Sequence, residues 1–366
     1  MTLIRTLSNR TLKGHKAVIF TTVPTPQKQI DAIGKQFPDL KIVTRVRPWG
    51  APTGDGFSED EWKDTTVLLT STILPTREQA PHLQYVQLTS AGANQVIKNP
   101  VFSGTDIPFC TANGVHGPQI AEWIITTYLT FQHRLKDYWK LQEQGKWKRL
   151  VVNNQDAEDT VGKRIGILGY GSIGRQTARV AKAIGLDVHA YTLHPRPTPE
   201  SRRDNSYSPA GLGDPEGVFP SKWFSGGTKE EIHDFLGSGL DILVIATPLT
   251  DKTRNLIAKA EFQVLGAKRT FVSNIARGPI VNTDDLIGAL NSGLIQGAAL
   301  DVTDPEPLPD GHPLWSAKNV TITPHISSTS AAYFSRLFEI FSLNLERLSE
   351  GEEEDLINKV NRKEGY

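Results

Sequence analysis

The sequence predicts an α/β fold with two domains, each built on a doubly wound parallel sheet. Short apolar strands alternate with helical segments along most of the chain, which is typical of a parallel sheet with helices on both faces. A length of 366 residues corresponds to about two domains. A glycine-rich turn also stands between a strand and a helix near the middle of the chain, as in dinucleotide-binding α/β domains.

The composition excludes several classes of function. With 38% hydrophobic and 22% charged residues, the chain suits a soluble globular protein. Lys+Arg and Asp+Glu both number 40, so nothing in the net charge favours nucleic acid or an anionic membrane as a partner. The one cysteine, Cys110, excludes an internal disulfide, and we interpret it as a small buried apolar residue. Because signal-peptide and membrane-span patterns are also missing, we expect a cytoplasmic protein.

Residues 1–117 predict a first α/β domain with a parallel sheet. Helix-like or turn-like segments separate the candidate strands, which lie at 17–20, 40–43, 67–69 and 85–88. The turn Ser90, Ala91 and Gly92 directly follows the fourth of these strands. Its small residues leave backbone N–H groups open to a carboxylate, although an ordinary strand-to-helix turn is the alternative.

Residues 118–143 predict one long helix. Pro118 suits its first turn, and apolar residues recur at helical spacing along it. We expect most of this apolar stripe to lie in the core or in a subunit contact.

Residues 161–192 contain a strand, a glycine turn, a helix and a second strand. Gly169, Gly171 and Gly174 follow the first strand in the spacing G-x-G-x-x-G. In this context the first glycine makes the tight turn, the second lets backbone approach a pyrophosphate, and the third lets helix and strand pack closely. The N–H groups at the helix N-terminus would hold the phosphates. We therefore predict a dinucleotide site here, in preference to a purely structural turn.

Residues 194–228 are rich in proline and glycine, which predicts an irregular surface excursion and no buried structure. A capping box at 228–231 then begins a short helix. The acidic run at 350–355 is typical of a solvated face.

Each later strand ends beside a polar or charged residue. The predicted strands 241–246, 270–275, 297–300 and 320–322 lead into Thr247 with Pro248, Ala276 with Arg277, Asp301, and Thr323-Pro324-His325. Ligands bind at the carboxyl ends of the strands in open α/β sheets. We therefore expect these residues to lie at a ligand-binding edge.

Four residues are candidates for chemistry. Arg277 offers a guanidinium fork that suits a carboxylate, Asp301 ends a strand, Glu306 lies between two prolines, and His325 follows the last strand. Each also has an ordinary interpretation, as a structural histidine, a buried ion pair or a surface turn. It is the occurrence of all four residues in one chain that favours catalysis.

Together they resemble one family, the D-isomer-specific 2-hydroxyacid dehydrogenases. The motifs that carry this resemblance occur in the family's order: Gly169-Tyr170-Gly171-Ser172-Ile173-Gly174, Asn274-Ile275-Ala276-Arg277-Gly278, Gly297-Ala298-Ala299-Leu300-Asp301-Val302, Glu306-Pro307-Leu308-Pro309 and Thr323-Pro324-His325.

The resemblance implies a domain arrangement. Residues 1–117 and 325–366 would form a flavodoxin-like substrate domain, and 118–324 a Rossmann dinucleotide domain, with the substrate in the cleft between them. It also implies a homodimer formed through the dinucleotide domain, partly by the long helix.

The resemblance also implies roles for the catalytic residues. Arg277 would bind the substrate carboxylate and carbonyl, and His325 would be the general acid in reduction and the base in reverse. Glu306 would hydrogen-bond His325 and favour its charged form. These roles suit the chemistry, since a developing alkoxide needs a proton donor in reach while hydride arrives from the other side.

The predicted binding residues are more numerous. Substrate contacts are assigned to Ser90, Ala91, Gly92, Arg277 and His325. Dinucleotide contacts are assigned to Gly169, Gly171, Ser172, Ile173, Gly174, Thr192, Arg196, Thr247, Pro248, Ile275, Ala276, Arg277, Asp301 on the nicotinamide side, and His325. No metal site is expected.

The sequence departs from the family pattern at the cofactor. An NAD site usually has Asp or Glu about 20 residues after the glycine turn, and Thr192 stands there. His194, Arg196, Arg202 and Arg203 follow it and are candidates to approach a 2′-phosphate. The sequence therefore favours NADP(H) over NAD(H), and with it the reductive direction. The second departure is the excursion 194–228, which is longer than the usual connection.

Two functions remain open. The first is a reductase that converts a small 2-oxo acid, such as glyoxylate or hydroxypyruvate, to the D-2-hydroxy acid with NADP or NAD. The second is a dinucleotide-sensing binding protein or corepressor on the same fold. A formate-oxidising enzyme is less consistent, because that branch has Gln where this chain has Glu306.

Overall fold

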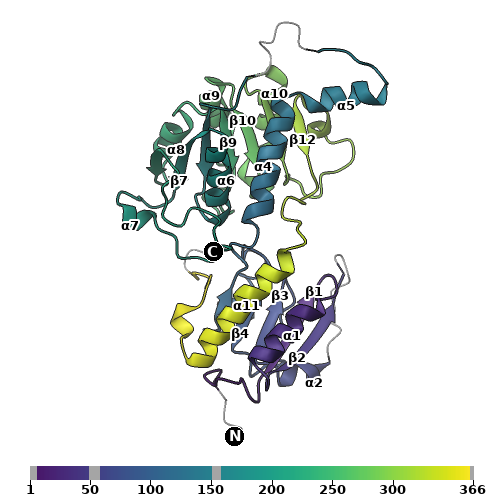
Figure 1. Ribbon diagram of the computed structural model, residues 1–366, viewed down its shortest axis with the longest axis vertical. Coiled ribbons are helices and arrows are strands. Elements are labelled where there is room, and N and C mark those ends of the chain that lie inside the picture. Colours follow the sequence, from purple (N-terminus) through teal and green to yellow (C-terminus); the bar gives the residue numbers. More distant parts are fainter. Residues whose placement is uncertain (1–5, 49–57, 151–157, 363–366) are drawn as a thin grey trace. The chain divides into compact units, whose positions relative to one another are not determined.

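The computed structural model describes residues 6–48, 58–150 and 158–362 (Figure 1). The chain divides into two compact units, Met1–Val115 with Ser330–Tyr366, and His116–Thr329. The predicted divisions after residues 117 and 324 differ from these by a few residues. As a result, His325 lies in the second unit and not in the C-terminal segment to which the sequence assigned it.

The first unit contains a five-stranded parallel sheet. Its order is β2-β1-β3-β4-β5, the order of flavodoxin-like folds. The strands are β1 (Lys16–Thr21), β2 (Lys41–Val46), β3 (Val67–Thr70), β4 (Tyr85–Leu88) and β5 (Phe109–Cys110). The four predicted strands are confirmed. Strand β5 was not predicted, because two residues are too few to show a repeating pattern.

Helices from both ends of the chain belong to this unit. They are α1 (Gln27–Gln36), α2 (Glu59–Lys63), α3 (Pro100–Ser103) and α11 (Tyr333–Glu350), with a 3₁₀ turn η3 (Glu353–Asp355). Figure 1 shows α1 and α11 side by side over the sheet, and the two helices contact each other. Residues 350–355 are exposed, as their acidic composition predicts.

The second unit contains a seven-stranded parallel sheet of order β12-β11-β10-β9-β6-β7-β8. The strands are β6 (Arg164–Leu168), β7 (Asp187–Thr192), β8 (Lys222–Ser225), β9 (Ile242–Ile245), β10 (Phe271–Asn274), β11 (Gly297–Leu300) and β12 (Val320–Ile322). The sheet starts at β6, extends to β7 and β8 on one side, and continues from β9 on the other. This is the Rossmann order, and its topological switch point lies between β6 and β9.

Helices cover both faces of this sheet. Helices α4 (Gly117–Gln132) and α6 (Ser172–Ala183) pack against each other on one face, over a core that includes Ile124, Tyr128 and Ala178. The core of the other face includes Phe235, Phe262 and Leu286, from α8 (Lys229–Leu236), α9 (Lys259–Gly266) and α10 (Thr283–Ser292). The predicted capping box of α8 is confirmed, because Thr228 and Glu231 bond each other's backbone N–H groups.

The prediction of one helix over 118–143 is wrong. The structure has two helices, α4 and α5 (Leu135–Glu143), separated at His133 and Arg134. Arg134 adopts a left-handed conformation, with φ of +54°, which ends the first helix and redirects the chain. None of the residues of α5 is buried, so the buried stripe ends with α4.

The prediction that 194–228 is irregular and unburied is wrong in part. This segment contains α7 (Pro199–Arg202) and ends in β8, which pairs with β7. Tyr207 and Asp214 are buried within it. Prolines and glycines break its regular hydrogen bonding locally, but side chains of α6 supply replacement partners, as described below.

No helix in the described ranges is long and apolar enough to cross a membrane.

Candidate active site

The glycine turn joins β6 to α6, and two of its glycines admit no side chain. Gly169 has φ of +102°, and a Cβ there would lie 2.7 Å from the backbone of Ala246 and Thr247, after β9. A Cβ on Gly174 would lie 2.5 Å from the Gly169 carbonyl oxygen. The turn therefore sits directly on the switch point, with helix and strand in close contact.

Gly171 differs from its two neighbours in the motif. A Cβ there would meet nothing within 4 Å, and Gly171 is the N-cap residue of α6 without a side-chain cap. Ser172 and Ile173 form the first helical turn beside it and are half-buried. A helix N-terminus with open space beside it suits an anion, so these residues fit the pyrophosphate of a dinucleotide.

The second unit brings most of the predicted site residues to one edge. Five residues complete a parallel strand or follow its end directly: Gly169, Thr192, Ile275, Asp301 and Thr323. Thr247 lies two residues after the end of β9. Pro248, Ala276, Arg277 and His325 lie a few residues further along the same loops. This is the ligand-binding edge of a Rossmann sheet.

Asn274 shapes the turn that carries Arg277. Its side chain is buried, accepts from Ala276 N (3.1 Å) and donates to the Arg277 carbonyl oxygen (3.1 Å). Asn274 was not among the residues predicted from the sequence to form the site. An asparagine at a strand end is the available signal, since its side chain can bond the backbone of the turn that follows, here two and three residues ahead.

Arg277 is half-buried and lies near Glu306. Its Nη1 donates to the Ala276 carbonyl oxygen at 2.7 Å, which leaves other N–H groups for a ligand. Burial lowers the pKa of Arg277, and the Glu306 carboxylate opposes this effect. A Cβ on Gly278 would lie 1.8 Å from the Thr303 carbonyl oxygen, so only glycine lets the Arg277 loop approach the loop that leads to Glu306.

His325 and Glu306 form the central pair of the site. Nδ1 of His325 lies 2.8 Å from Oε1 of Glu306, and the two side chains are 43% and 40% exposed. With Nδ1–H donated to the carboxylate, Nε2 is the ring atom that remains for a substrate. The pair can therefore deliver a proton to a bound oxygen or accept one from it.

Asp301 holds the loop that carries His325. Its carboxylate is buried and accepts from the Thr323 hydroxyl (2.5 Å) and from the N–H groups of Ile326 and Ser327 (both 2.9 Å). Its backbone carbonyl accepts from His325 N at 2.9 Å. This positioning role was not predicted, because it joins residues that lie far apart in sequence. The predicted contact with nicotinamide stays a prediction.

The residues predicted to contact the ribose or its 2′-phosphate make several hydrogen bonds to one another and to their neighbours. Thr192 donates its hydroxyl to the His194 carbonyl oxygen at 2.8 Å. Arg196 donates one N–H to the Ser201 carbonyl oxygen, Arg202 bonds the Arg196 and Pro197 carbonyl oxygens, and Arg203 pairs with Glu216 at 2.8 Å. The sheet end therefore carries a basic segment without a carboxylate at Thr192.

The turn Ser90 to Gly92 lies in the first unit, after β4. Ser90 Oγ donates to the Gly92 carbonyl oxygen (2.7 Å), and Gln95 Nε2 donates to Ser90 Oγ (2.7 Å). Tyr333 of α11 donates its hydroxyl to the Thr89 carbonyl oxygen at 2.8 Å. The turn is thus fixed by its own unit.

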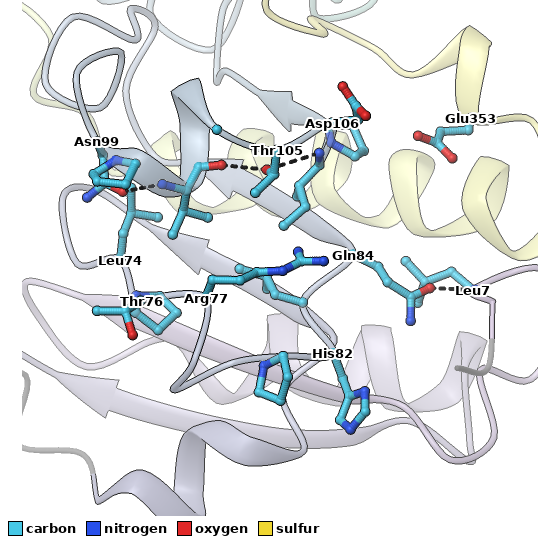
Figure 2. A pocket seen from close by; sticks show the side chains of 18 of the residues that line it. Leu7, Leu74, Thr76, Arg77, His82, Gln84, Asn99, Thr105, Asp106 and Glu353 are labelled. Atoms are coloured by element: carbon cyan, nitrogen blue, oxygen red, sulfur yellow. Dashed lines mark hydrogen bonds between the residues drawn. The ribbon is translucent and has the colours of Figure 1, made fainter. Parts of the chain in front are cut away.

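A cavity of about 1050 Å³ also lies in the first unit. Figure 2 shows Arg77 extending into it, with His82, Asn99 and Glu353 among the other lining residues. None of the predicted site residues lines it. Among the described residues there is no cluster of three or more His, Cys, Asp or Glu side chains that could hold a metal ion.

Comparisons with known proteins bear on this site. The family model described as D-isomer specific 2-hydroxyacid dehydrogenase, NAD binding domain, matches residues 125–212 and 223–327. A glyoxylate reductase from Thermofilum pendens is 31% identical over 75% of this chain and 74% of its own length. A hydroxypyruvate reductase from Blautia hydrogenotrophica is 27% identical over 77% and 80%. The solved structure of a D-isomer specific 2-hydroxyacid dehydrogenase from Xanthobacter autotrophicus, in complex with NADPH and MES, is 25% identical, with a TM-score of 0.74 over 97% of this chain and 100% of that chain.

Proposed function

Because the chain belongs to the D-isomer specific 2-hydroxyacid dehydrogenase family, we propose that it reduces a 2-oxo acid to the D-2-hydroxy acid with a nicotinamide dinucleotide. The observation that carries this proposal is the 2.8 Å contact between His325 and Glu306, near Arg277 and at the same sheet edge as the glycine turn. An acid/base pair, a carboxylate-binding cation and a phosphate-binding turn are the groups that this reaction needs.

The chain's own residues divide the work. The dinucleotide, when bound, supplies the hydride that reaches C2 of the 2-oxo acid. Arg277 holds the substrate carboxylate and polarises its carbonyl, and His325 donates the Nε2 proton to the carbonyl oxygen as negative charge develops there. Glu306 holds Nδ1–H and stabilises the imidazolium before transfer.

The turn at Ser90, Ala91 and Gly92 is our proposed second contact for the substrate carboxylate. The internal bonds of Ser90 and Gln95 keep the turn compact. Ser90→Ala should raise KM for the oxo acid more than it lowers kcat, because it removes the hydroxyl that holds the carboxylate-binding backbone of the turn in place and leaves the proton donor His325 unchanged. An unchanged KM would remove this turn from the site.

We propose NADP(H) as the preferred cofactor. Thr192 provides no carboxylate to accept from a ribose 2′-OH or to repel a 2′-phosphate, and Arg196 is the nearest arginine after it. The related Xanthobacter enzyme was solved with NADPH. Thr192→Asp should raise the catalytic efficiency with NADH relative to that with NADPH. Arg196→Ala should weaken the binding of NADPH more than the binding of NADH. A wild-type preference for NADH would contradict the cofactor choice and leave the reaction class intact.

Glyoxylate and hydroxypyruvate are the proposed substrates, because two relatives carry these names. The deciding experiment measures kcat/KM for glyoxylate, hydroxypyruvate, pyruvate, and branched and aromatic 2-oxo acids, each with NADPH and NADH. Steady turnover of one of them supports the enzyme. A protein that binds dinucleotide but turns over none of them would instead support the sensing or corepressor alternative, which no named relative favours.

We further propose a cytoplasmic homodimer. The single Cys110 is buried, which suits a protein without disulfides, and α5 presents Leu135 and Trp139 to the surface of its unit. Light scattering of the purified protein decides the oligomeric state, and Trp139→Glu should shift it to monomer if α5 contributes.

A further inference from the structure

The segment between β7 and β8 places a buried carboxylate against the glycine turn. We call residues 204–219 the strap. Asp214 of the strap is 2% exposed, and its carboxylate accepts the Tyr170 hydroxyl hydrogen bond at 2.7 Å. Tyr170, which is 4% exposed, stands between Gly169 and Gly171 in the motif. A charged group of the strap is thus bonded to the turn that fits the pyrophosphate.

Asp214 is fully engaged within the protein. Its carboxylate oxygens accept from the N–H groups of Val218 (2.9 Å) and Phe219 (3.1 Å). Burial and the Asp214 charge raise the pKa of Tyr170, so the phenol stays protonated and donates. Because a buried carboxylate is costly unless its oxygens are bonded, this arrangement favours a single placement of Tyr170.

Side chains of α6 hold the rest of the strap. Arg175 is 5% exposed, forms an ion pair with the Asp204 carboxylate (3.0 Å) and donates Nη1–H to the Asp214 carbonyl oxygen (2.5 Å). Gln176 accepts from Gly213 N (2.7 Å), and Arg179 donates to the Gly213 carbonyl oxygen (2.8 Å). The strap is therefore docked on the helix whose N-terminus faces the phosphate position.

Two further contacts link this docking to the basic segment and to β8. Arg175 also donates to the Arg202 carbonyl oxygen at 2.7 Å, and Arg202 bonds the Arg196 carbonyl oxygen. The ring of Trp223 on β8 meets the Tyr170 ring edge to face, with centroids 5.0 Å apart. The buried residues Tyr170, Arg175 and Asp214, together with the half-buried Arg202, thus connect the glycine turn to the segment proposed to contact the ribose.

Asp214 lies outside the part of the chain that matches the family. The match covers 125–212 and 223–327 and omits 213–222. Tyr170 and Arg175 lie within the matched region, whereas Asp214, the partner that they share, does not. The contact with the turn therefore comes from a part of this chain that the family pattern does not describe.

We propose that Asp214 and Tyr170 are positioning residues for the dinucleotide: the strap fixes the glycine turn and the basic segment in their binding conformations. This inference rests on the proposed function, since it requires that the second unit bind a nicotinamide dinucleotide. The pair touches neither substrate nor reacting atoms. Its loss should therefore act on cofactor affinity and leave the proton transfer by His325 intact.

The test uses Tyr170→Phe, which removes one hydroxyl and keeps the ring. The dissociation constant of NADPH, measured at 25 °C by fluorescence titration, should rise roughly threefold to tenfold, because a hydrogen bond to a charged group is lost. At saturating NADPH, kcat and KM for the oxo acid should stay at wild-type values. Asp214→Asn should raise the NADPH dissociation constant by an equal or larger factor. The factor for the double variant should be smaller than the product of the two single factors, since the residues act as a pair.

Tyr128→Phe is the matched control, because Tyr128 is also buried in this unit and its hydroxyl has no hydrogen-bond partner in the described structure. If the NADPH dissociation constant is unchanged in Tyr170→Phe, even with a lower melting temperature, this inference is overturned and the proposed function is not affected. An equal effect in the control would have the same consequence. If Asp214→Asn fails to fold, Tyr170→Phe decides. Wild-type protein that binds neither NADPH nor NADH would overturn the proposed function, and this inference with it.

Discussion

His325 owes its position to backbone geometry that side chains around it maintain. Its φ of +54° lies in the left-handed region that non-glycine residues rarely occupy. The bonds from Asp301 to the Thr323 hydroxyl and to the N–H groups of Ile326 and Ser327 hold the loop on both sides of it. The buried carboxylate of Asp301 therefore orients the imidazole of His325 toward Glu306.

We predict that His325→Gln lowers kcat by roughly 10²–10⁴, which is the usual contribution of a positioned proton donor. NADPH affinity should change little, because the glycine turn is untouched. Steady-state kinetics and NADPH titration of the same preparation check both statements. His312→Gln is the control, because His312 is a histidine of the same unit with a structural role: it caps a 3₁₀ turn (Pro313–Ser316). Near wild-type turnover in His325→Gln would refute the assignment.

We predict that Arg277→Lys lowers kcat/KM by roughly tenfold or more. Lysine keeps the charge but loses the planar fork that binds carboxylate through two parallel hydrogen bonds. The melting temperature should change little, because within the described part of the chain the Arg277 guanidinium makes one hydrogen bond, to its neighbour Ala276. Arg254→Lys, at an exposed position in the same unit, is the control. Full activity, or failure to fold, would contradict the substrate role.

Among the helices and strands, those with a repeating apolar pattern were predictable. Strand β9 is buried along its length and is a run of apolar residues for that reason, and β6 is buried and largely apolar after Arg164. The break at Arg134 was not predictable, because arginine has no preference for a positive φ and the sequence on either side is helical. The burial of Asp214 was not predictable either, since its partners lie on α6 and in the glycine turn.

Some residues of the candidate site were likewise predictable from the sequence, and others were not. The order of its motifs predicted Arg277, Glu306 and His325 as catalytic, and the structure brings Glu306 and His325 into contact. Their catalytic roles stay predictions. The supporting bonds of Asn274 and Asp301 were not predictable. Those of Asp301 join loops that follow different strands, and such contacts exist only once the sheet has formed.

Strand β7 carries a buried histidine, His189, and we predict that it lowers the stability of this unit in acid. Burial lowers the pKa of His189 to about 4, with Arg164 acting in the same direction and Asp187 opposing it. The unfolded state therefore takes up a proton near the ordinary histidine pKa of about 6.5, whereas the folded state does so only near pH 4. Stability should fall between these two values, by on the order of 2 kcal/mol.

Urea unfolding at pH 7.5 and pH 5 measures this effect. His189→Gln should reduce the difference between the two pH values, because the amide is neutral at both. The exposed His133→Gln variant should keep the wild-type difference. An equal pH dependence in His189→Gln would show that other groups are responsible.

Across the whole chain, the first unit is completed by its last segment. Residues 330–366 return to the unit formed by 1–115 and supply α11. Asn344 of α11 is fully buried, and its Nδ2 donates to the Tyr85 hydroxyl (3.0 Å) and to Gln87 (3.3 Å). The same side chain accepts from Ile357 N at 2.7 Å. One polar residue thus connects strand β4 to the C-terminal segment.

We predict that Asn344→Ala destabilises the first unit by about 2–4 kcal/mol, since several buried polar groups lose their partner. The dinucleotide site lies in the second unit, which has its own core, so the NADPH dissociation constant should stay at the wild-type value. Limited proteolysis should cut first within residues 6–115, and substrate turnover should fall as that unit opens. Asn291→Ala, at an exposed position of the second unit, is the control. Simultaneous loss of NADPH binding and of the first unit would show that the two units unfold as one, and would refute this assignment of stability to separate cores.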